Sequence, residues 1–270
     1  PIVAAIWGWL PALLWIVVGT IFMGAVHDLG ALVTSLRHEG RGIADYLKDL
    51  MGTKASQLMY IITFFVLVLV SAVFVHVIAT LLSKYPASVW SIWIEIPLAI
   101  LIGCTIHYQF KVSIPLASLV AVAVMYIMIL VGIRYPLALS YNTWVVILLI
   151  YMFIAARLPV WFLVQARDYI NFHELIIAMG ILTIAIFVLG GGAQVVAPAV
   201  RIAPQGAPPI WPFVMITIAC GAISGWHSIV GSGTSSKQIE NEQDARRIGY
   251  GAMLGEGYLA MIALVTAVVG

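Results

Sequence analysis

Apolar residues occur along this chain in long runs that short polar segments separate. A helix needs about 17 to 25 residues to cross the hydrocarbon of a bilayer, and the runs match that length. The pattern therefore predicts eight membrane-spanning helices, at residues 1–26, 57–82, 90–107, 112–133, 141–156, 172–192, 210–227 and 251–270. The fifth is short for a span, as a tilted or broken helix would be.

Composition supports a membrane protein. Of the 270 residues, 63% are hydrophobic and 9% are charged, whereas about a quarter of the residues in soluble domains are charged. We therefore expect an all-α polytopic bundle in which residues 1–270 form a single transmembrane domain. The first apolar run is too long for a secretory leader and is interpreted as a span. Because the chain starts at Pro1 and stops within an apolar run, we expect an internal fragment of a longer protein.

The distribution of positive charge predicts the orientation of the spans. The first, third, fifth and seventh connections between them carry ten lysines and arginines, and the other three connections carry three. Cytoplasmic loops are enriched in these residues, so we place the odd connections, including Lys111 in the third, in the cytoplasm. Residue 1 then lies on the outer side.

Two connections have distinct characters. Residues 40–52 place Ile43, Leu47 and Leu50 on one helical face, which predicts a cytoplasmic helix at the membrane surface. Residues 190–212 repeat glycine and proline and carry one charge, so they predict no stable helix. That outer segment is either a surface loop or a segment that dips back into the protein.

Ionisable residues within or beside the spans are candidates for function, because a charge costs about 2.5 to 3.5 kcal/mol in hydrocarbon. Four groups stand near predicted span ends, on the cytoplasmic side: His27 with Asp28, Arg157 with Arg167 and Asp168, His227 with Ser228, and Glu256. Each one alone could be an ordinary boundary residue. Glu95 has no polar neighbours in the sequence and is interpreted as structural or interfacial.

Residues 224–251 are polar and rich in glycine, yet they lie between two apolar runs. Gly221 with Gly225, and Gly251 with Gly255, have the spacing of close helix contacts. That spacing does not explain the density of hydroxyls from Ser224 to Ser236, which favours an unwound turn that offers hydrogen-bond donors and acceptors.

A helix is predicted to resume after that turn. Ser235 and Gln238 have capping-box spacing, acids come first and Arg246 and Arg247 come last, as the helix dipole prefers. Transporters use interrupted helices of this kind to hold substrate carboxylates and coupling ions.

Other kinds of chemistry find no support. The six histidines show no spacing typical of haem or metal ligands. Residues 231–235 contain neither a nucleophile elbow nor a phosphate-binding loop. We predict no catalytic residues, no metal and no cofactor, and we expect no nucleic-acid partner.

Three blocks of the sequence together resemble the carbon starvation protein A family of transporters. They are "GAVHDLGALVTSLRHEGRGI" (24–43), "LPVWFLVQARDYI" (158–170) and "CGAISGWHSIVGSGTSSKQIENEQDARRIGYGAMLGEG" (220–257), in the family's order. The chain departs from the family pattern at Ala166, Trp226 and Gly231. The resemblance implies uptake of pyruvate-like organic anions or short peptides across the cytoplasmic membrane, with protons or another coupling cation, in the response to carbon starvation. It also implies a leucine-transporter-like fold of inverted repeats with broken helices, completed by flanking helices absent from this chain and surrounded by lipid.

Within that frame we assign expected roles. Substrate binding is expected from Ser224, His227, Ser228, Thr234, Ser235 and Arg167, and proton coupling from His227, Asp28, His27, Asp168 and Glu256. Histidine titrates near neutrality, and Arg167 supplies a fixed charge paired with Asp168 or Asp28 when the site is empty. The alternative function is a non-transporting membrane sensor or assembly subunit, and a membrane enzyme comes third.

Overall fold

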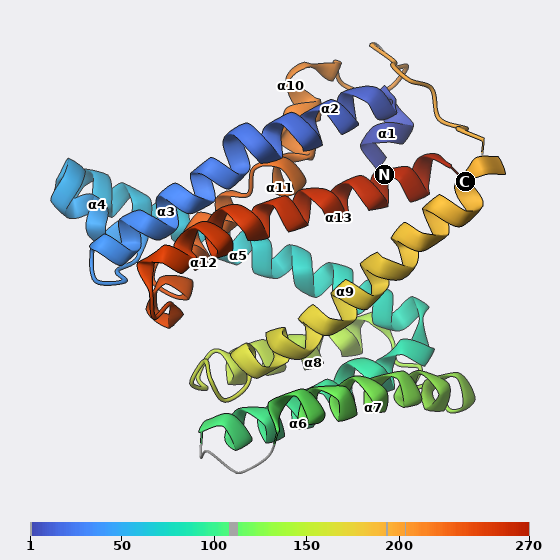
Figure 1. Cartoon of the computed structure of the whole chain (residues 1–270), viewed down its shortest axis with the longest axis horizontal. Helices are drawn as coiled ribbons and strands as arrows, with labels where there is room; N and C mark the ends of the chain where they lie inside the picture. Colours follow the sequence, from blue (N-terminus) through green and yellow to red (C-terminus); the bar gives the residue numbers. More distant parts are fainter. Residues whose placement is uncertain (1, 108–112, 193, 203, 270) are drawn as a thin grey trace. The chain divides into compact units, whose positions relative to one another are not determined.

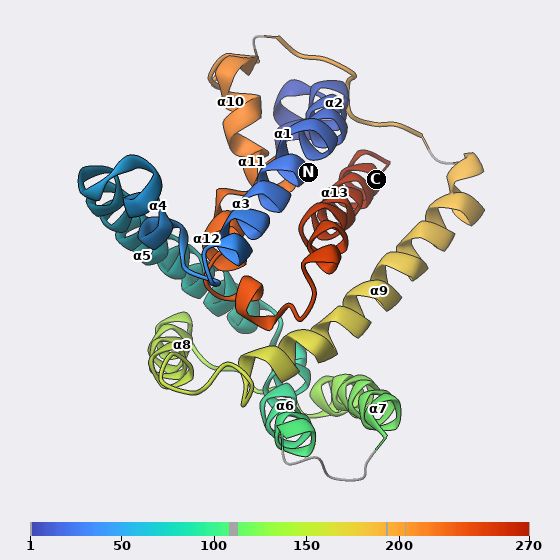
Figure 2. The same ribbon diagram turned by 60° about the vertical axis from the view of Figure 1, so that its left-hand side comes forward.

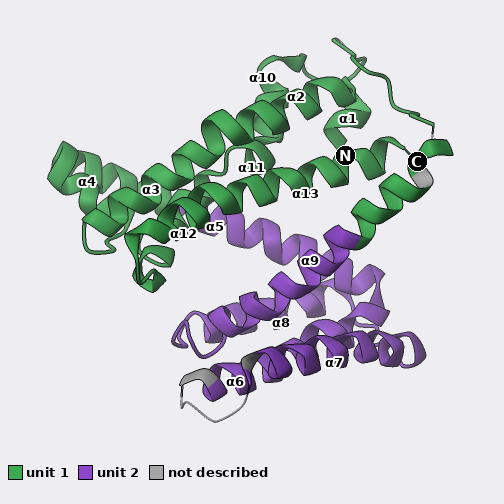
Figure 3. Cartoon of the chain, viewed as in Figure 1, with its two compact units in different colours: residues 1–64, 181–270 green, residues 65–180 purple. Residues whose placement is uncertain are grey.

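The computed structural model describes residues 2–107, 113–192, 194–202 and 204–269. The chain divides into two compact units, one formed by residues 1–64 and 181–270 and the other by residues 65–180 (Figure 3). The described residues form helices, turns and irregular segments, with no strand among them. The two units are called unit 1 and unit 2 below and are described separately.

Unit 1 is built from eight helices together with parts of α5 and α9 (Figures 1 and 2). The eight are α1 (Ile2–Trp7), α2 (Trp9–Gly19), α3 (Ala25–Arg37), α4 (Ile43–Met51), α10 (Ile210–Thr217), α11 (Ala219–Ala222), α12 (Gly225–Gly231) and α13 (Gly251–Val268). A π-helical turn at Thr20–Gly24 joins α2 to α3, and a second at Arg246–Tyr250 leads into α13. The helix from Trp9 to Arg37 is therefore continuous over 29 residues.

Unit 2 contains α6 (Val89–His107), α7 (Ile114–Arg134) and α8 (Tyr141–Ala155). α6 and α7 lie side by side in Figures 1 and 2. The helices α5 (Thr53–Lys84) and α9 (Val164–Leu189) each begin in one unit and end in the other. α5 has 32 residues and spans about 48 Å, and no residue of its most apolar stretch is buried, as expected for a surface that faces lipid.

Among the described residues, six helices are long and apolar enough to cross a membrane, which identifies a multi-pass membrane protein. They are Trp9–Arg37, Thr53–Lys84, Pro86–Thr105, Pro115–Arg134, Val164–Val188 and Glu242–Val268. The predicted count of eight is not confirmed, because 141–156 forms a helix of only 15 residues and 210–227 is broken. Residues 1, 112 and 270 of the predicted spans, and Lys111, lie outside the described residues.

Two predicted boundaries are wrong in ways that affect the functional residues. The first span was expected to end near Val26, but its helix runs on to Arg37, so His27 and Asp28 lie within it. The sixth was expected to begin at residue 172, but α9 begins at Val164 and includes Arg167 and Asp168. In both cases a polar pair was taken for a boundary because its partners on other helices were not visible in the sequence.

The first apolar run is broken at Gly8, between α1 and α2, and residues of the segment 194–202 pack against this break. Gly8 has φ 96°, and a side chain there would collide with the carbonyl of Ala199. The amides of Trp9 and Leu10 donate to the carbonyls of Pro198 and Ala199 at 3.2 and 3.0 Å. The glycine- and proline-rich connection therefore supplies acceptors to the exposed start of a helix, as the helix geometry requires.

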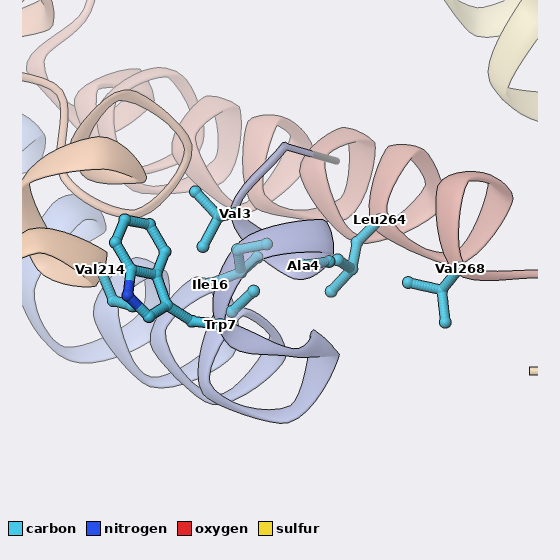
Figure 4. Close-up of a cluster of buried hydrophobic side chains, with 8 residues drawn as sticks. Val3, Ala4, Trp7, Ile16, Val214, Leu264 and Val268 are labelled. Carbon is cyan, nitrogen blue, oxygen red and sulfur yellow. The ribbon is translucent and has the colours of Figure 1, made fainter. Parts of the chain in front are cut away.

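A cluster of buried apolar side chains holds this end of unit 1 together (Figure 4). Trp7 and Ile16 lie beside Val214 from α10 and Leu264 from α13. The indole nitrogen of Trp7 donates to the carbonyl of Pro208 at 3.0 Å. Unit 2 has two clusters of its own, one between α6, α7 and α9 and one between α5, α6 and α8.

Small residues allow the helix Trp9–Arg37, called the long helix below, to approach two other parts of unit 1 closely. These are the segment Ile210–Gly231, which is broken into short helices, and α13. A side chain at Gly24 would lie 2.4 Å from the carbonyl oxygen of Ala222, and one at Gly257 would lie 2.6 Å from the side chain of Thr20. Of the four glycines with predicted contact spacing, only Gly221 has close neighbours among the described residues. Apart from the one at Gly221, the close contacts in unit 1 thus use other glycines than those that the spacing indicates.

The predicted helix at residues 40–52 is present as α4, Ile43–Met51. Its buried residues are Ala44 and Tyr46, and Leu50 from the expected apolar face is exposed. Ile43 and Leu47 from that face are partly buried. The location of α4 at the cytoplasmic membrane surface stays a prediction.

We predict that Gly24→Ala destabilises the intact protein by about 1 to 3 kcal/mol, because the added methyl group must displace the backbone carbonyl of Ala222. The matched control is Gly30→Ala in the same long helix, where an added methyl group meets nothing within 4 Å. Alanine favours the helix at that position by up to about 1 kcal/mol. The unfolding midpoints of both variants in detergent test this, and equal midpoints would contradict the close contact.

Candidate functional site

The last apolar run before α13 is interrupted at Ile223 and Ser224. Both residues have extended backbone angles, φ −157° and ψ 96° at Ile223 and φ −89° and ψ 110° at Ser224. α11 ends at Ala222, and α12 begins at Gly225. The hydroxyl of Thr20 donates to the carbonyl of Gly221 at 3.2 Å, so the long helix satisfies one acceptor just before the break. The predicted interruption is confirmed, and it is shorter than expected.

His227 follows the break and lies between two carboxylates. Its Nδ1 lies 2.7 Å from an oxygen of Asp28 on α3, and its Nε2 lies 2.8 Å from an oxygen of Glu256 on α13. His27 Nδ1 lies 3.1 Å from the other oxygen of Asp28. Asp28 is only 8% exposed, whereas the other three side chains are partly open. The structure thus brings four of the predicted residues together from three helices.

The geometry around His227 requires an additional proton. A neutral imidazole carries one N–H donor and one bare nitrogen. Since both ring nitrogens of His227 face carboxylate oxygens, a neutral ring beside two ionised acids would leave one nitrogen lone pair against an oxygen lone pair. One more proton, on the ring or on either acid, removes this repulsion. The cluster therefore has the composition of a site that stores a proton.

A cavity of about 380 Å³ opens beside this cluster. Its wall includes Asp28, His227 and Glu256, together with the ring of Trp226 and the hydroxyl-bearing Ser235. The remaining lining is mainly apolar, from Leu32, Val230, Gly231, Ile248, Gly249 and Ala252. A cavity with an apolar wall and a few convergent polar groups is typical of a small-molecule site.

The other predicted hydroxyl residues do not line this cavity as far as the structure is described. Ser224 and Ser228 are buried, and the Ser228 hydroxyl donates to the carbonyl of Gly225 at 2.8 Å. Thr234 is exposed, and its carbonyl accepts from the side-chain amide of Gln238. In this conformation, Ser235 is the only one of the four in the cavity wall.

The helix predicted to resume at Ser235 begins only at Glu242, from which helical turns run on through Arg246 and Arg247 into α13. Residues Ser235–Gln238 and Glu242–Asp244 are separate 3₁₀ turns, with extended backbone at Ile239 and Asn241 between them. The capping-box bonds of Ser235 and Gln238 are absent among the described hydrogen bonds of this turn. Tertiary bonds replace them, including an ion pair at 3.0 Å between Arg37 and Glu242.

A network of buried serines, which the sequence did not indicate, fastens the segment after α12 to the end of α3. The Ser35 hydroxyl donates to the carbonyl of Arg41 at 2.7 Å and contacts the Ser236 hydroxyl at 2.8 Å. The amide of Gly233 donates to both hydroxyls, at 3.2 and 3.1 Å. The Ser232 hydroxyl accepts from the amide of Ile43 and donates to the carbonyl of Ser228.

Arg167 and Asp168 belong to unit 2, on α9, whereas the residues of the His227 cluster belong to unit 1. Among the described ion pairs of unit 2, Arg167 pairs with Glu95 on α6 and not with the expected Asp168, since its Nε donates to a Glu95 carboxylate oxygen at 3.0 Å. The expected pairing with Asp28, a residue of unit 1, stays a prediction. Arg167 also donates from Nη1 to the Tyr151 hydroxyl at 3.2 Å. Glu95 was interpreted as having no polar neighbours, and this is wrong because Arg167 pairs with it in the folded chain. An acid inside an apolar run needs a cation, and that need was the available signal.

Arg157 and Cys220 lie in different surroundings. Arg157 is exposed and lies 5.0 Å from the ring of Phe153. The Cys220 thiol lies 3.7 Å from Glu256, within the surroundings of the His227 cluster. Within the part of the chain that the structure describes, no group of three or more histidine, cysteine or acidic side chains is placed to hold a metal ion.

Comparison with known proteins identifies relatives along the whole chain. It is 34% identical to the peptide transporter CstA of Bacillus subtilis, over 99% of this chain and 46% of that protein. It is 32% identical to the peptide transporter CstA of Campylobacter jejuni, over 99% of this chain and 40% of that protein. It is 33% identical to the pyruvate/proton symporter BtsT of Escherichia coli, over 99% of this chain and 39% of that protein.

The chain thus spans less than half the length of these relatives. No solved structure matches it significantly. Residues 1–269 match the family model described as carbon starvation protein CstA. With the three sequence blocks, the interrupted helix and the relatives along its length, the chain belongs to the carbon starvation protein CstA family.

Proposed function

We propose that the protein to which this chain belongs is a secondary active transporter in the cytoplasmic membrane. It imports a small organic anion such as pyruvate, or short peptides, together with protons during carbon starvation. The observation that carries the proposal is His227, which lies between Asp28 and Glu256 at the edge of a cavity and directly after a helix break. Relatives named as peptide transporters and as a pyruvate/proton symporter support it.

The proposed proton site is the cluster of His27, Asp28, His227 and Glu256. Its four ionisable groups share protons over distances of 2.7 to 3.1 Å, so a proton can move within the cluster without crossing hydrocarbon. Loss or gain of one proton changes the cluster's charge beside the cavity. A substrate carboxylate in the cavity binds more tightly when that proton is present, because the added positive charge attracts it.

The proposed substrate site is the adjacent cavity, with Ser235 and the protonated His227 as its polar contacts. Its volume of about 380 Å³ is ample for a small carboxylate and is within the range for a dipeptide. Ser224, Ser228 and Thr234 stay proposed substrate residues, although Ser228 must first exchange its bond to Gly225. Arg167 and Asp168 are proposed to serve anion binding and proton coupling in unit 2.

The interrupted segment also supports a leucine-transporter-like arrangement of inverted repeats. In such folds, broken helices carry the substrate and ion sites because their free backbone groups line a cavity and not lipid. The segment from Ile210 to Gly231 has this character, since it consists of three short helices and not one span.

The direct test is uptake by the intact protein in liposomes, with labelled pyruvate or a labelled dipeptide. We expect accumulation of one of them when the outside is made acidic, and collapse of that accumulation when a protonophore removes the gradient. Absence of accumulation for both substrates under every gradient would favour the alternative, a membrane sensor or assembly subunit.

We predict that His227→Gln reduces proton-driven uptake to the level of protein-free liposomes, because the acids lose the group that shares their proton. The matched control is His76→Gln, since His76 contacts the Tyr141 hydroxyl and no acid is described beside it. Size-exclusion profiles must show that both variants fold. Uptake by folded His227→Gln at the wild-type rate would reduce His227 to a packing residue.

Lys237 serves as a test of specificity. It lies in the third sequence block that resembles the family, residues 220–257, but its side chain is exposed and its methylene groups lie against Gly40. We expect Lys237→Gln to leave the KM for the transported substrate unchanged, because an exposed lysine contributes little to binding in a separate cavity. A raised KM in initial-rate measurements would place Lys237 at the substrate.

A further inference from the structure

Unit 2 contains a buried acid with an incomplete set of partners. Glu95 on α6 is 3% exposed. Its Oε2 accepts from Arg167 Nε at 3.0 Å, while its Oε1 has no hydrogen-bond partner among the described residues. The side chain of Asn171 also lies close to this carboxyl group. Buried carboxylates normally have every oxygen bonded, so this one is poorly suited to remain charged permanently.

The surroundings of Glu95 act in opposite directions. Burial favours a neutral carboxyl group, and the guanidinium of Arg167 favours a charged one. The other ionisable groups that face the pair are Asp168 and Glu174 on α9 and Tyr151 on α8. α7 contributes the apolar residues Ala117, Ala121 and Met125 to this region. Because burial and the nearby cation oppose each other, neither the neutral nor the charged form of Glu95 is strongly excluded, and the group can change its protonation state.

Arg167 is accessible enough to change partners. Its side chain is 31% exposed, whereas that of Glu95 is 4% exposed. Its bond to the Tyr151 hydroxyl holds the guanidinium in place even when the acid is not charged. Asp168, Asn171 and Glu174 follow at intervals of three residues on α9 and line an open groove of about 590 Å³. Phe172, Leu175 and Ala178 complete its lining, so the groove is mainly apolar with a few polar groups, and it lies on the helix that bears Arg167.

We propose that Glu95 is a proton-binding residue that controls Arg167, so that protonation of the carboxylate breaks the ion pair and frees the guanidinium to bind a carboxylate anion. The proposal rests on the proposed function, and it adds a proton site at Glu95 in unit 2 to the one around His227 in unit 1. The proton enters as H⁺ and forms an O–H bond on Glu95, and the anion then replaces the acid as the counter-ion of Arg167. Deprotonation of Glu95 restores the ion pair and expels the anion.

Charge balance favours this exchange inside a membrane. The pair Glu95⁻ and Arg167⁺ has no net charge, and neutral Glu95 with Arg167⁺ and one bound carboxylate has none either. The exchange therefore does not change the net charge of this low-dielectric region, where an added charge is costly. One proton accompanies one carboxylate group at this site.

The test uses Glu95→Gln in the intact protein, because glutamine imitates the protonated acid permanently. We expect this variant to retain exchange of internal for external labelled pyruvate and to lose accumulation driven by a pH gradient. The matched control is Glu240→Gln, an exposed acid in unit 1, which should retain both activities. Wild-type accumulation by Glu95→Gln, or equal loss of exchange and accumulation in the folded variant, would overturn the proposal.

An infrared measurement separates this proposal from the proposed function. The folded wild-type protein should show a protonated carboxyl band that appears as the pH falls and is absent from Glu95→Gln. In Arg167→Gln, the band should persist to higher pH, because the cation that favours the charged form is gone. This second variant decides the case if Glu95→Gln does not fold. A wild type that transports neither pyruvate nor dipeptides but shows this titration would refute only the transport function, and a band unaffected by either variant would refute the role of Glu95.

Discussion

The central constraint on this molecule is that a charged side chain between apolar helices must have a partner of opposite charge. In unit 1, the buried Asp28 meets that requirement with two histidines, and His227 in turn holds Glu256. In unit 2, the buried Glu95 meets it with Arg167. Neither arrangement is complete, since the first needs an additional proton and the second leaves an oxygen without a bond. Incomplete pairing of this kind is stable in one protonation state and strained in another, which is the property that a coupled transporter uses.

The backbone around the first cluster serves the same requirement. A continuous helix from Ile210 to Gly231 would direct all its polar backbone groups along its own axis. The break at Ile223 and Ser224 instead brings His227 to the end of a short helix, facing the long helix and α13. The buried serine network around Ser35 then fixes the chain that follows. The position of the cluster is thus set by the helix break and by a few short-range hydrogen bonds in the chain that follows it.

The sequence predicted those features that depend on local physics. The lengths of apolar runs located the long helices, and the cost of charges in hydrocarbon identified His27, Asp28, His227 and Glu256 before their contacts were known. Features that depend on distant partners were not predicted. Glu95 meets an arginine 72 residues further along the chain, and the break at Gly8 depends on carbonyls near residue 199. The capping pattern at Ser235 favoured a helix, but the buried hydrogen bonds among Ser35, Gly233 and Ser236 hold the chain in another conformation.

The contact between Gly24 and the carbonyl of Ala222 has a mechanical consequence. Because the backbones touch at that point, the long helix and the interrupted segment cannot slide past each other by one residue without bringing a side chain into the gap. The two elements are therefore held in register at this point, so a shift of one along its axis must carry the other with it.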